Sequence, residues 1–159
     1  MTNLPLEGVR IIELSDIIAL PHSMGMVSDM GAQVVRIDPC ARLGQRASGP
    51  FPDNRPRERF WNQSGMFNWF NRNKLSLALD LNTPRGVELF KALVAVSDAV
   101  VENFTPNVMA RWGLDYRSLA RVKPDIIMLS NTGWGHEGPW KDYPGLAHVI
   151  ETVTGLANY

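Results

Sequence analysis

Two features of this sequence carry side chains that could take part in a reaction. The first is Cys40, the single cysteine of the chain, which excludes an intramolecular disulfide and a cysteine-cluster metal site. As a lone thiol beside Pro39, with no histidine near it in sequence, it could be a nucleophile but fits an incidental residue better. The second is His136 next to Glu137, which could form an acid/base pair. Adjacent residues usually point apart, however, so a solvated loop histidine is the favoured interpretation of this pair.

Basic residues concentrate in one irregular segment, residues 41–73, where hydrophobic periodicity disappears and Gly, Pro, Asn and Asp mark turns. Five arginines belong to it: Arg42, Arg46, Arg55, Arg57 and Arg59. Such a cluster is either a solvated face or a loop that contacts the phosphates of a nucleotide-containing ligand. The aromatic residues that follow, between 60 and 70, are expected to pack under this loop rather than to stack on bases.

The composition is that of an ordinary globular domain. The 159 residues are 45% hydrophobic and 20% charged, and 16 Lys and Arg balance 16 Asp and Glu. A chain without a basic surplus is a poor candidate for binding nucleic acid. No apolar run is long enough to span a membrane, and the first residues do not have the pattern of a signal peptide. We therefore expect a cytoplasmic protein without a metal, a nucleic-acid partner or a membrane partner.

The stretch from residue 6 to residue 38 predicts a strand, a loop, a helix and a second strand. Its two apolar runs, residues 9–14 and 34–37, are typical of buried parallel strands. Pro21 can open the intervening helix at its first position, and Gly31 suits its C-terminus. The loop of residues 15–21 would then lie at the carboxyl edge of the sheet, where α/β folds bind ligands.

The same loop lacks the G-x-G-x-x-G pattern of the common dinucleotide folds and is apolar instead. It is therefore either a plain hydrophobic connection or a surface for an adenine face or a pantetheine arm. The remaining pattern predicts strands over 75–81, 99–101 and 126–130 and helices over 84–97, 107–112, 116–122 and 146–157. This alternation predicts a single α/β domain, residues 1–159, with a doubly wound parallel sheet.

Seven stretches, in order along the chain, resemble the amino-terminal part of the class III CoA-transferase family. They are LEGVRIIELS (6–15), DMGAQVVRID (29–38), NRNK (71–74), LDLNTPRG (79–86), AVVENF (99–104), RWGL (111–114) and GWGHEGP (133–139). The family includes formyl-CoA and carnitine CoA-transferases, with α-methylacyl-CoA racemase as a sister branch. The resemblance implies a Rossmann-like domain that binds coenzyme A and a reaction that moves CoA from an acyl-CoA to a carboxylic acid.

The resemblance also implies which residues hold CoA. Its adenosine part would lie on a set of strand-end residues: Ile17, Ile18, Ala19, Leu79, Asn103, Phe104, Arg111 and Trp112. Trp134 would line the thioester end. Two basic positions of the family fall here on Pro39 and Asn82. The phosphate charge would therefore come from Arg36, Arg42 or Lys74, among which the sequence does not decide.

In the family an aspartate attacks the thioester and carries the acyl group as a mixed anhydride. By family spacing this aspartate would follow Tyr159, together with a second, smaller domain. The family members form interlocked homodimers, so we expect these 159 residues alone to be inactive and to expose apolar surface.

Three alternatives stay open: a partner subunit that binds CoA without activity, a racemase relative, and a generic nucleotide binder. The racemase Gly-His-Asp run falls here on Gly145, Leu146 and Ala147, which disfavours that reading.

Overall fold

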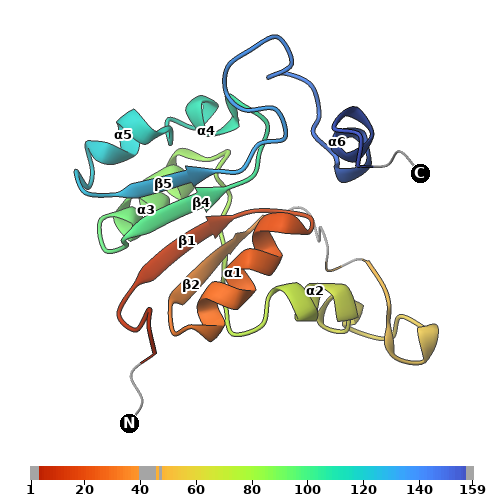
Figure 1. Cartoon of the computed structure of the whole chain (residues 1–159). Helices are drawn as coiled ribbons and strands as arrows, with labels where there is room; N and C mark the ends of the chain where they lie inside the picture. The colour runs from red at the N-terminus through yellow and green to blue at the C-terminus, as the bar shows by residue number, and fades with distance from the viewer. Residues whose placement is uncertain (1–3, 40–45, 47, 157–159) are drawn as a thin grey trace.

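A computed structural model describes residues 4–39, 46 and 48–156 of the chain (Figure 1). Its centre is a five-stranded sheet in which every neighbouring pair is parallel and the strand order is β3-β2-β1-β4-β5. The strands are β1 (Arg10–Leu14), β2 (Gln33–Asp38), β3 (Leu75–Ala78), β4 (Ala99–Glu102) and β5 (Ile127–Ser130). The predicted α/β fold with a parallel sheet is confirmed.

Helices cover both faces of this sheet. The described helices are α1 (Ala19–Asp29), α2 (Gly65–Phe70), α3 (Pro84–Val94), α4 (Val108–Arg111), α5 (Tyr116–Ala120) and α6 (Ala147–Val153), with 3-10 turns at Pro52–Asn54 and Phe60–Asn62. Figure 1 shows α1 beside β1 and β2, α2 next to α1, and α4 and α5 near β5. The last helix, α6, lies away from the sheet in this view and has no buried residue.

Strand β1 divides the hydrophobic core into two clusters because its alternate side chains point to opposite faces. Ile12 and Leu14 belong to the cluster that contains the fully buried Phe90 of α3. Ile11 belongs to the other cluster, with Leu20 of α1. A strand covered on both faces needs apolar residues in succession, which explains the continuous runs in the sequence.

Local signals in the sequence set several helix ends. Gly31 follows α1 with a φ of 100°, in the left-handed region that glycine occupies without a Cβ penalty. The Thr83 hydroxyl accepts a hydrogen bond from the Gly86 amide at 3.1 Å, and Pro84 occupies the first turn of α3. Helix α1 begins at Ala19, so Pro21 lies inside its first turn rather than opening it.

Helix α2 lies in the segment that the sequence predicted to be irregular, so that prediction is wrong at this point. The Ser64 hydroxyl caps the helix by accepting a hydrogen bond from the Phe67 amide at 3.1 Å. Phe67 and Phe70 are buried, whereas Trp69 is exposed. A helix of six residues is too short to show a 3.6-residue repeat, which explains why the sequence pattern missed it.

Strand β3 is shorter than predicted and ends at Ala78. The chain then turns, and the Asp80 carbonyl accepts hydrogen bonds from the Thr83 amide at 3.3 Å and from its hydroxyl at 2.8 Å. Helix α3 ends at Val94 rather than near Ser97. The early end of β3 is important for the site because it leaves residues 79–82 free to line a cavity.

Apolar side chains are exposed on both edge strands, on α6 and on the residues that flank α6, in agreement with the predicted exposure of apolar surface. These are Leu75, Leu77, Ile127, Leu129, Leu146, Val149, Val153 and Leu156. Within the described residues, no helix has both the length and the apolar character needed to cross a membrane.

Candidate functional site

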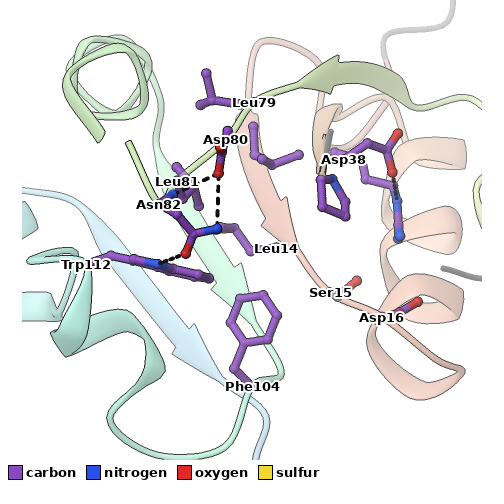
Figure 2. Close-up of a pocket in the computed structure, with 13 residues that line it drawn as sticks. Leu14, Ser15, Asp16, Asp38, Leu79, Asp80, Leu81, Asn82, Phe104 and Trp112 are labelled. Carbon is purple, nitrogen blue, oxygen red and sulfur yellow. Dashed lines mark hydrogen bonds and ion pairs between the residues drawn. The ribbon is translucent and has the colours of Figure 1, made fainter. Parts of the chain in front are cut away.

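A cavity of about 190 Å³ opens at the carboxyl ends of β1 and β2, between them and the turn that follows β4 (Figure 2). The chain leaves β1 toward β2 on one side, while β4 lies on the other side, so the strand order reverses here. Open α/β sheets bind ligands at such switch points. The lining residues are Leu14, Ser15, Asp16, Arg36, Ile37, Asp38, Pro39, Leu79, Asp80, Leu81, Asn82, Phe104 and Trp112.

Two aromatic rings form one wall of this cavity. Phe104 and Trp112 meet edge to face, with ring centroids 5.6 Å apart and planes at 84°. The Trp112 indole donates to Asn82 Oδ1 at 3.2 Å, and Asn82 Nδ2 donates to Asp80 Oδ1 at 3.0 Å (Figure 2). This chain of hydrogen bonds fixes the indole beside the cavity. An aromatic wall near apolar residues such as Leu79 can hold a flat ring system.

Close packing at Gly86 holds the turn that carries Asp80 and Asn82. A Cβ built on Gly86 would lie 1.8 Å from the Asp80 carbonyl oxygen. Only glycine therefore allows the first turn of α3 to approach Asp80 this closely. The Asn82 amide also donates to Asp80 Oδ1 at 3.0 Å, which fixes the turn from within.

Asp38, the last residue of β2, uses both carboxylate oxygens within the protein. Arg36 Nε contacts Oδ1 at 2.9 Å, and Arg46 Nη2 contacts Oδ2 at 2.9 Å, where the Ser76 hydroxyl also donates. Burial raises the pKa of Asp38, but the hydrogen bonds from Arg46, Ser76 and Arg36 outweigh burial and leave this pKa below its usual value. Asp38 is therefore charged and forms part of the cavity wall. Both of its carboxylate oxygens are already engaged, by Arg36 on one side and by Arg46 and Ser76 on the other.

A second ionic group lies under the cavity. Glu13 is fully buried, and its carboxylate lies 2.7 Å from Lys74 Nζ and 3.7 Å from Arg36 Nη1. Lys74 also donates to the Pro21 carbonyl at 2.8 Å and to Asn71 Oδ1 at 3.0 Å. Burial lowers the pKa of Lys74 more than the neighbouring Glu13 raises it. The sequence left open that Lys74 supplies charge for a phosphate. Its side chain is 2% exposed, so it is not available to a phosphate in this structure.

The structure brings four of the sequence-predicted residues to the cavity: Arg36, Leu79, Phe104 and Trp112. Arg36 is 4% exposed and already paired, so a phosphate would compete with Asp38 for its guanidinium. Arg111 lines an open hollow that shares Trp112 and Asn82 with the cavity. The role of each of these residues in binding CoA stays a prediction.

Five other predicted residues lie outside the cavity lining. Ile17 and Ile18 are exposed in the loop after β1, and Ala19 is exposed at the start of α1. Asn103 uses its side-chain amide on the backbone of Asp16. Trp134 packs against Trp140 with centroids 5.3 Å apart and donates to the Pro144 carbonyl at 3.4 Å.

The residues proposed for acid/base or nucleophilic chemistry are not assembled into a catalytic group in the described part of the chain. No hydrogen bond or ion pair joins His136 to Glu137 among the interactions of residues 48–156. His136 lines a separate hollow near Glu102. Cys40 and Arg42 lie outside the described residues. The described residues also contain no group of three or more His, Cys, Asp or Glu side chains that could hold a metal ion.

Sequence reasoning placed the loop of residues 15–21, and with it Ser15 and Asp16, at the ligand-binding edge, but it did not name Asp38, Asp80 or Asn82 as lining residues. Asp38 stands at the end of β2, so the rule that ligands bind at the carboxyl edge could have found it. Asp80 and Asn82 could not be found in this way, because their place depends on the early end of β3.

Fold and cavity together define an α/β protein with a cavity at the switch point of its parallel sheet. The model of the family described as CoA-transferase family III matches residues 6–159, so the chain belongs to this family.

Curated relatives and solved structures agree with this assignment. The chain is 36% identical over 98% of its length to the succinyl-CoA–L-malate CoA-transferase beta subunit of Chloroflexus aurantiacus. It is 37% identical over 96% of its length to the succinate–glutarate CoA-transferase of Agrobacterium fabrum. The crystal structure of a CAIB/BAIF family protein from Brucella suis superposes with a TM-score of 0.85 at 33% identity, over 97% of this chain and 40% of that one. The chain spans 37% and 38% of the length of the two curated relatives.

Proposed function

We propose that the protein is a CoA-transferase that moves CoA from an acyl-CoA donor to a carboxylic acid, with CoA bound at the cavity beside Trp112 and Phe104. The observation that carries this proposal is the position of that aromatic wall. It stands at the switch point of the sheet, in a chain that matches the family over residues 6–159.

The charges of the cavity favour one orientation of CoA. Among the described residues, Asp16, Asp38 and Asp80 line the cavity together with one cation, Arg36, which is already paired. A phosphate would be repelled there, whereas the neutral adenine and ribose would not. Arg111 is exposed in the adjoining hollow. We therefore place the nucleoside in the cavity and direct the phosphates outward, toward Arg111.

The chemical step needs a nucleophile that we place outside residues 1–159. A carboxylate oxygen of an aspartate attacks the thioester carbonyl, the carbon–sulfur bond breaks, and the electron pair leaves with the CoA sulfur as a thiolate. The acyl group stays on the aspartate as a mixed anhydride, and the thiolate then attacks the aspartyl carbonyl, which releases the donor acid and leaves an aspartyl thioester. The acceptor carboxylate displaces the thiolate from this thioester to form a second anhydride, and the thiolate attacks the acceptor carbonyl to give the new acyl-CoA and the free aspartate. Residues 1–159 alone are then expected to bind CoA without transferring it.

The names of the relatives guide the choice of substrates. Those relatives transfer CoA between succinyl-CoA and L-malate or between succinate and glutarate, according to their names. We propose a dicarboxylic acid as acceptor and succinyl-CoA as donor. The Chloroflexus enzyme is named in alpha and beta subunits, so a second subunit is the alternative source of a missing nucleophile.

We also propose that the whole protein is a homodimer. Leu75, Leu77, Ile127 and Leu129 are exposed on the two edge strands, and α6 exposes its apolar face. Apolar surface of this kind is characteristic of protein–protein interfaces.

The test is an assay of the intact gene product with succinyl-CoA and a panel of glutarate, malate and acetate, with products identified by chromatography. Formation of glutaryl-CoA or malyl-CoA with release of succinate supports the proposal. Tight CoA binding with no transfer in this panel, alone or with a co-purified partner, would instead support the binding-only alternative. Racemisation of a 2-methylacyl-CoA without transfer would place the protein on the racemase branch.

A further inference from the structure

We infer that Asn103 is a positioning residue that clamps the loop after β1 in a strained conformation, so that the loop is ready to receive a ligand. This inference rests on the proposed function for the identity of the ligand, but the clamp itself is a property of the chain. It gives Asn103 a different role from the direct contact with CoA that the sequence resemblance implied.

The clamp consists of two hydrogen bonds from one side-chain amide. Asn103 Oδ1 accepts from the Asp16 backbone amide at 3.0 Å, and Asn103 Nδ2 donates to the Asp16 carbonyl at 2.7 Å. The Asn103 backbone amide donates to the Leu14 carbonyl at 3.3 Å. Side chain and backbone of Asn103 thus both hold the end of β1, which commits the amide to the protein rather than to a ligand.

The clamped loop contains a residue that opposes this conformation. Ile17 has a φ of 59°, in the left-handed region that β-branched residues rarely adopt. Its side chain is 54% exposed, so burial offers little compensation. Asp16 supports this turn, because its Oδ1 accepts from the Ile17 amide at 3.0 Å. The next residue, Ile18, has an ordinary helical φ of −79°, so the strain is confined to Ile17.

The clamp fixes the two sides of the cavity relative to each other. Asp16 lines the cavity from the loop after β1, and Phe104, adjacent to Asn103, lines it from the turn after β4 (Figure 2). Glu102 accepts from the Phe104 amide at 2.8 Å and so fixes the second side. A loop held in this way also presents Ile17 and Ile18 as an exposed apolar ledge. Without the clamp, the strain at Ile17 would favour a relaxed loop with Asp16 displaced.

A double-mutant cycle tests this inference in the intact gene product. Asn103→Asp keeps the shape of the side chain but replaces the donor to the Asp16 carbonyl with an acceptor. Ile17→Gly removes the conformational strain, and Ile18→Gly is the matched control because Ile18 is equally apolar but unstrained. The probe is coenzyme A, titrated by calorimetry. Hydrogen exchange of the amides of residues 16–18 is measured in parallel, and thermal unfolding verifies that each variant folds.

The expected result is a coupling between residues 103 and 17. The left-handed conformation of Ile17 shifts the equilibrium between the clamped and the relaxed loop by about tenfold toward the relaxed loop. Asn103→Asp is therefore expected to weaken CoA binding by about tenfold and to accelerate hydrogen exchange in the loop. In the Ile17→Gly background the same substitution is expected to weaken binding less than about threefold. In the Ile18→Gly background the full effect is expected to persist.

Two outcomes overturn the inference. In the first, Asn103→Asp leaves both CoA affinity and loop exchange unchanged. In the second, affinity falls equally in the wild-type and Ile17→Gly backgrounds while loop exchange is unchanged, which would make Asn103 a direct ligand contact. Failure of the wild-type protein to bind CoA would count against the proposed function alone, since the exchange data still decide whether the clamp exists.

Discussion

Replacement of Lys74 by Met is expected to destabilise the fold strongly, because it leaves the carboxylate of Glu13 buried without its main partner. Glu13 is fully buried, and the Lys74 side chain is 2% exposed with its Nζ 2.7 Å from the carboxylate. Removing one member of such a pair costs about 3–5 kcal/mol. Arg36 remains 3.7 Å from Glu13 and offers partial compensation, which puts the expected loss near the lower end, at about 3 kcal/mol.

The assay is thermal and urea unfolding followed by circular dichroism. A loss of about 3 kcal/mol lowers the melting temperature of a chain of this size by roughly 6–12 °C. The matched control is Arg85→Met, which breaks the exposed pair between Arg85 and Glu88, 2.7 Å apart. Exposed pairs contribute about 0–1 kcal/mol, so this variant is expected to melt close to the wild type.

A double variant separates the ion pair from packing. Replacing Glu13 with Leu and Lys74 with Met removes both charges of the buried pair, while Arg36 keeps its pair with Asp38. Such replacements are often neutral or stabilising. We therefore expect the double variant to be more stable than Lys74→Met alone. The reasoning is refuted if Lys74→Met costs no more than Arg85→Met, or if the double variant is the least stable of the three.

Three further predictions concern the cavity wall. The pKa of Asp38 in the folded state lies below its usual value of 3.8. Its ion pairs therefore stabilise the fold above about pH 3.8, and this stabilisation is lost as the pH falls through the lowered pKa. Asp38→Asn should flatten the dependence of unfolding free energy on pH in this acid range, and an unchanged dependence would contradict the assignment. Trp112→Ala should weaken CoA binding by roughly ten- to a hundredfold in calorimetry, because a stacked base contributes about 1–3 kcal/mol; unchanged affinity would exclude stacking on this indole. Gly86→Ala should lower the unfolding free energy by about 1–3 kcal/mol, since its Cβ would overlap the Asp80 carbonyl. Helix propensity alone predicts that this variant is more stable than the wild type, and that result would count against close packing of Gly86 on Asp80.

Much of the fold could be predicted because local chemistry and tertiary structure agree. The apolar runs of β1 and β2 are long enough to identify buried strands, and Thr83 with Pro84 marks the start of α3. Helix α2 could not be predicted from periodicity, because its stability depends on the Ser64 cap and on two phenylalanines that are buried only in the folded protein.

The candidate site was only partly predictable. Phe104 and Trp112 were chosen by resemblance and do line the cavity, whereas Trp134 packs elsewhere. Lys74 illustrates the main difficulty, because the sequence shows a cation but not the buried Glu13 that neutralises it. Only the tertiary structure shows which charged side chains from distant segments pair with each other. A charged residue in the sequence is therefore not necessarily free to contact a ligand.

The central claim is that the adenosine end of CoA occupies the cavity between Asp16, Asp80, Phe104 and Trp112. Photolabelling of the intact gene product with an 8-azidoadenine analogue of CoA, mapped by mass spectrometry, tests it most directly. We predict that the label falls on the peptide that contains Phe104 and Trp112 and that unlabelled CoA suppresses it. Labelling confined to a distant peptide, such as the one that contains His148, with the same suppression by CoA, would contradict the claim.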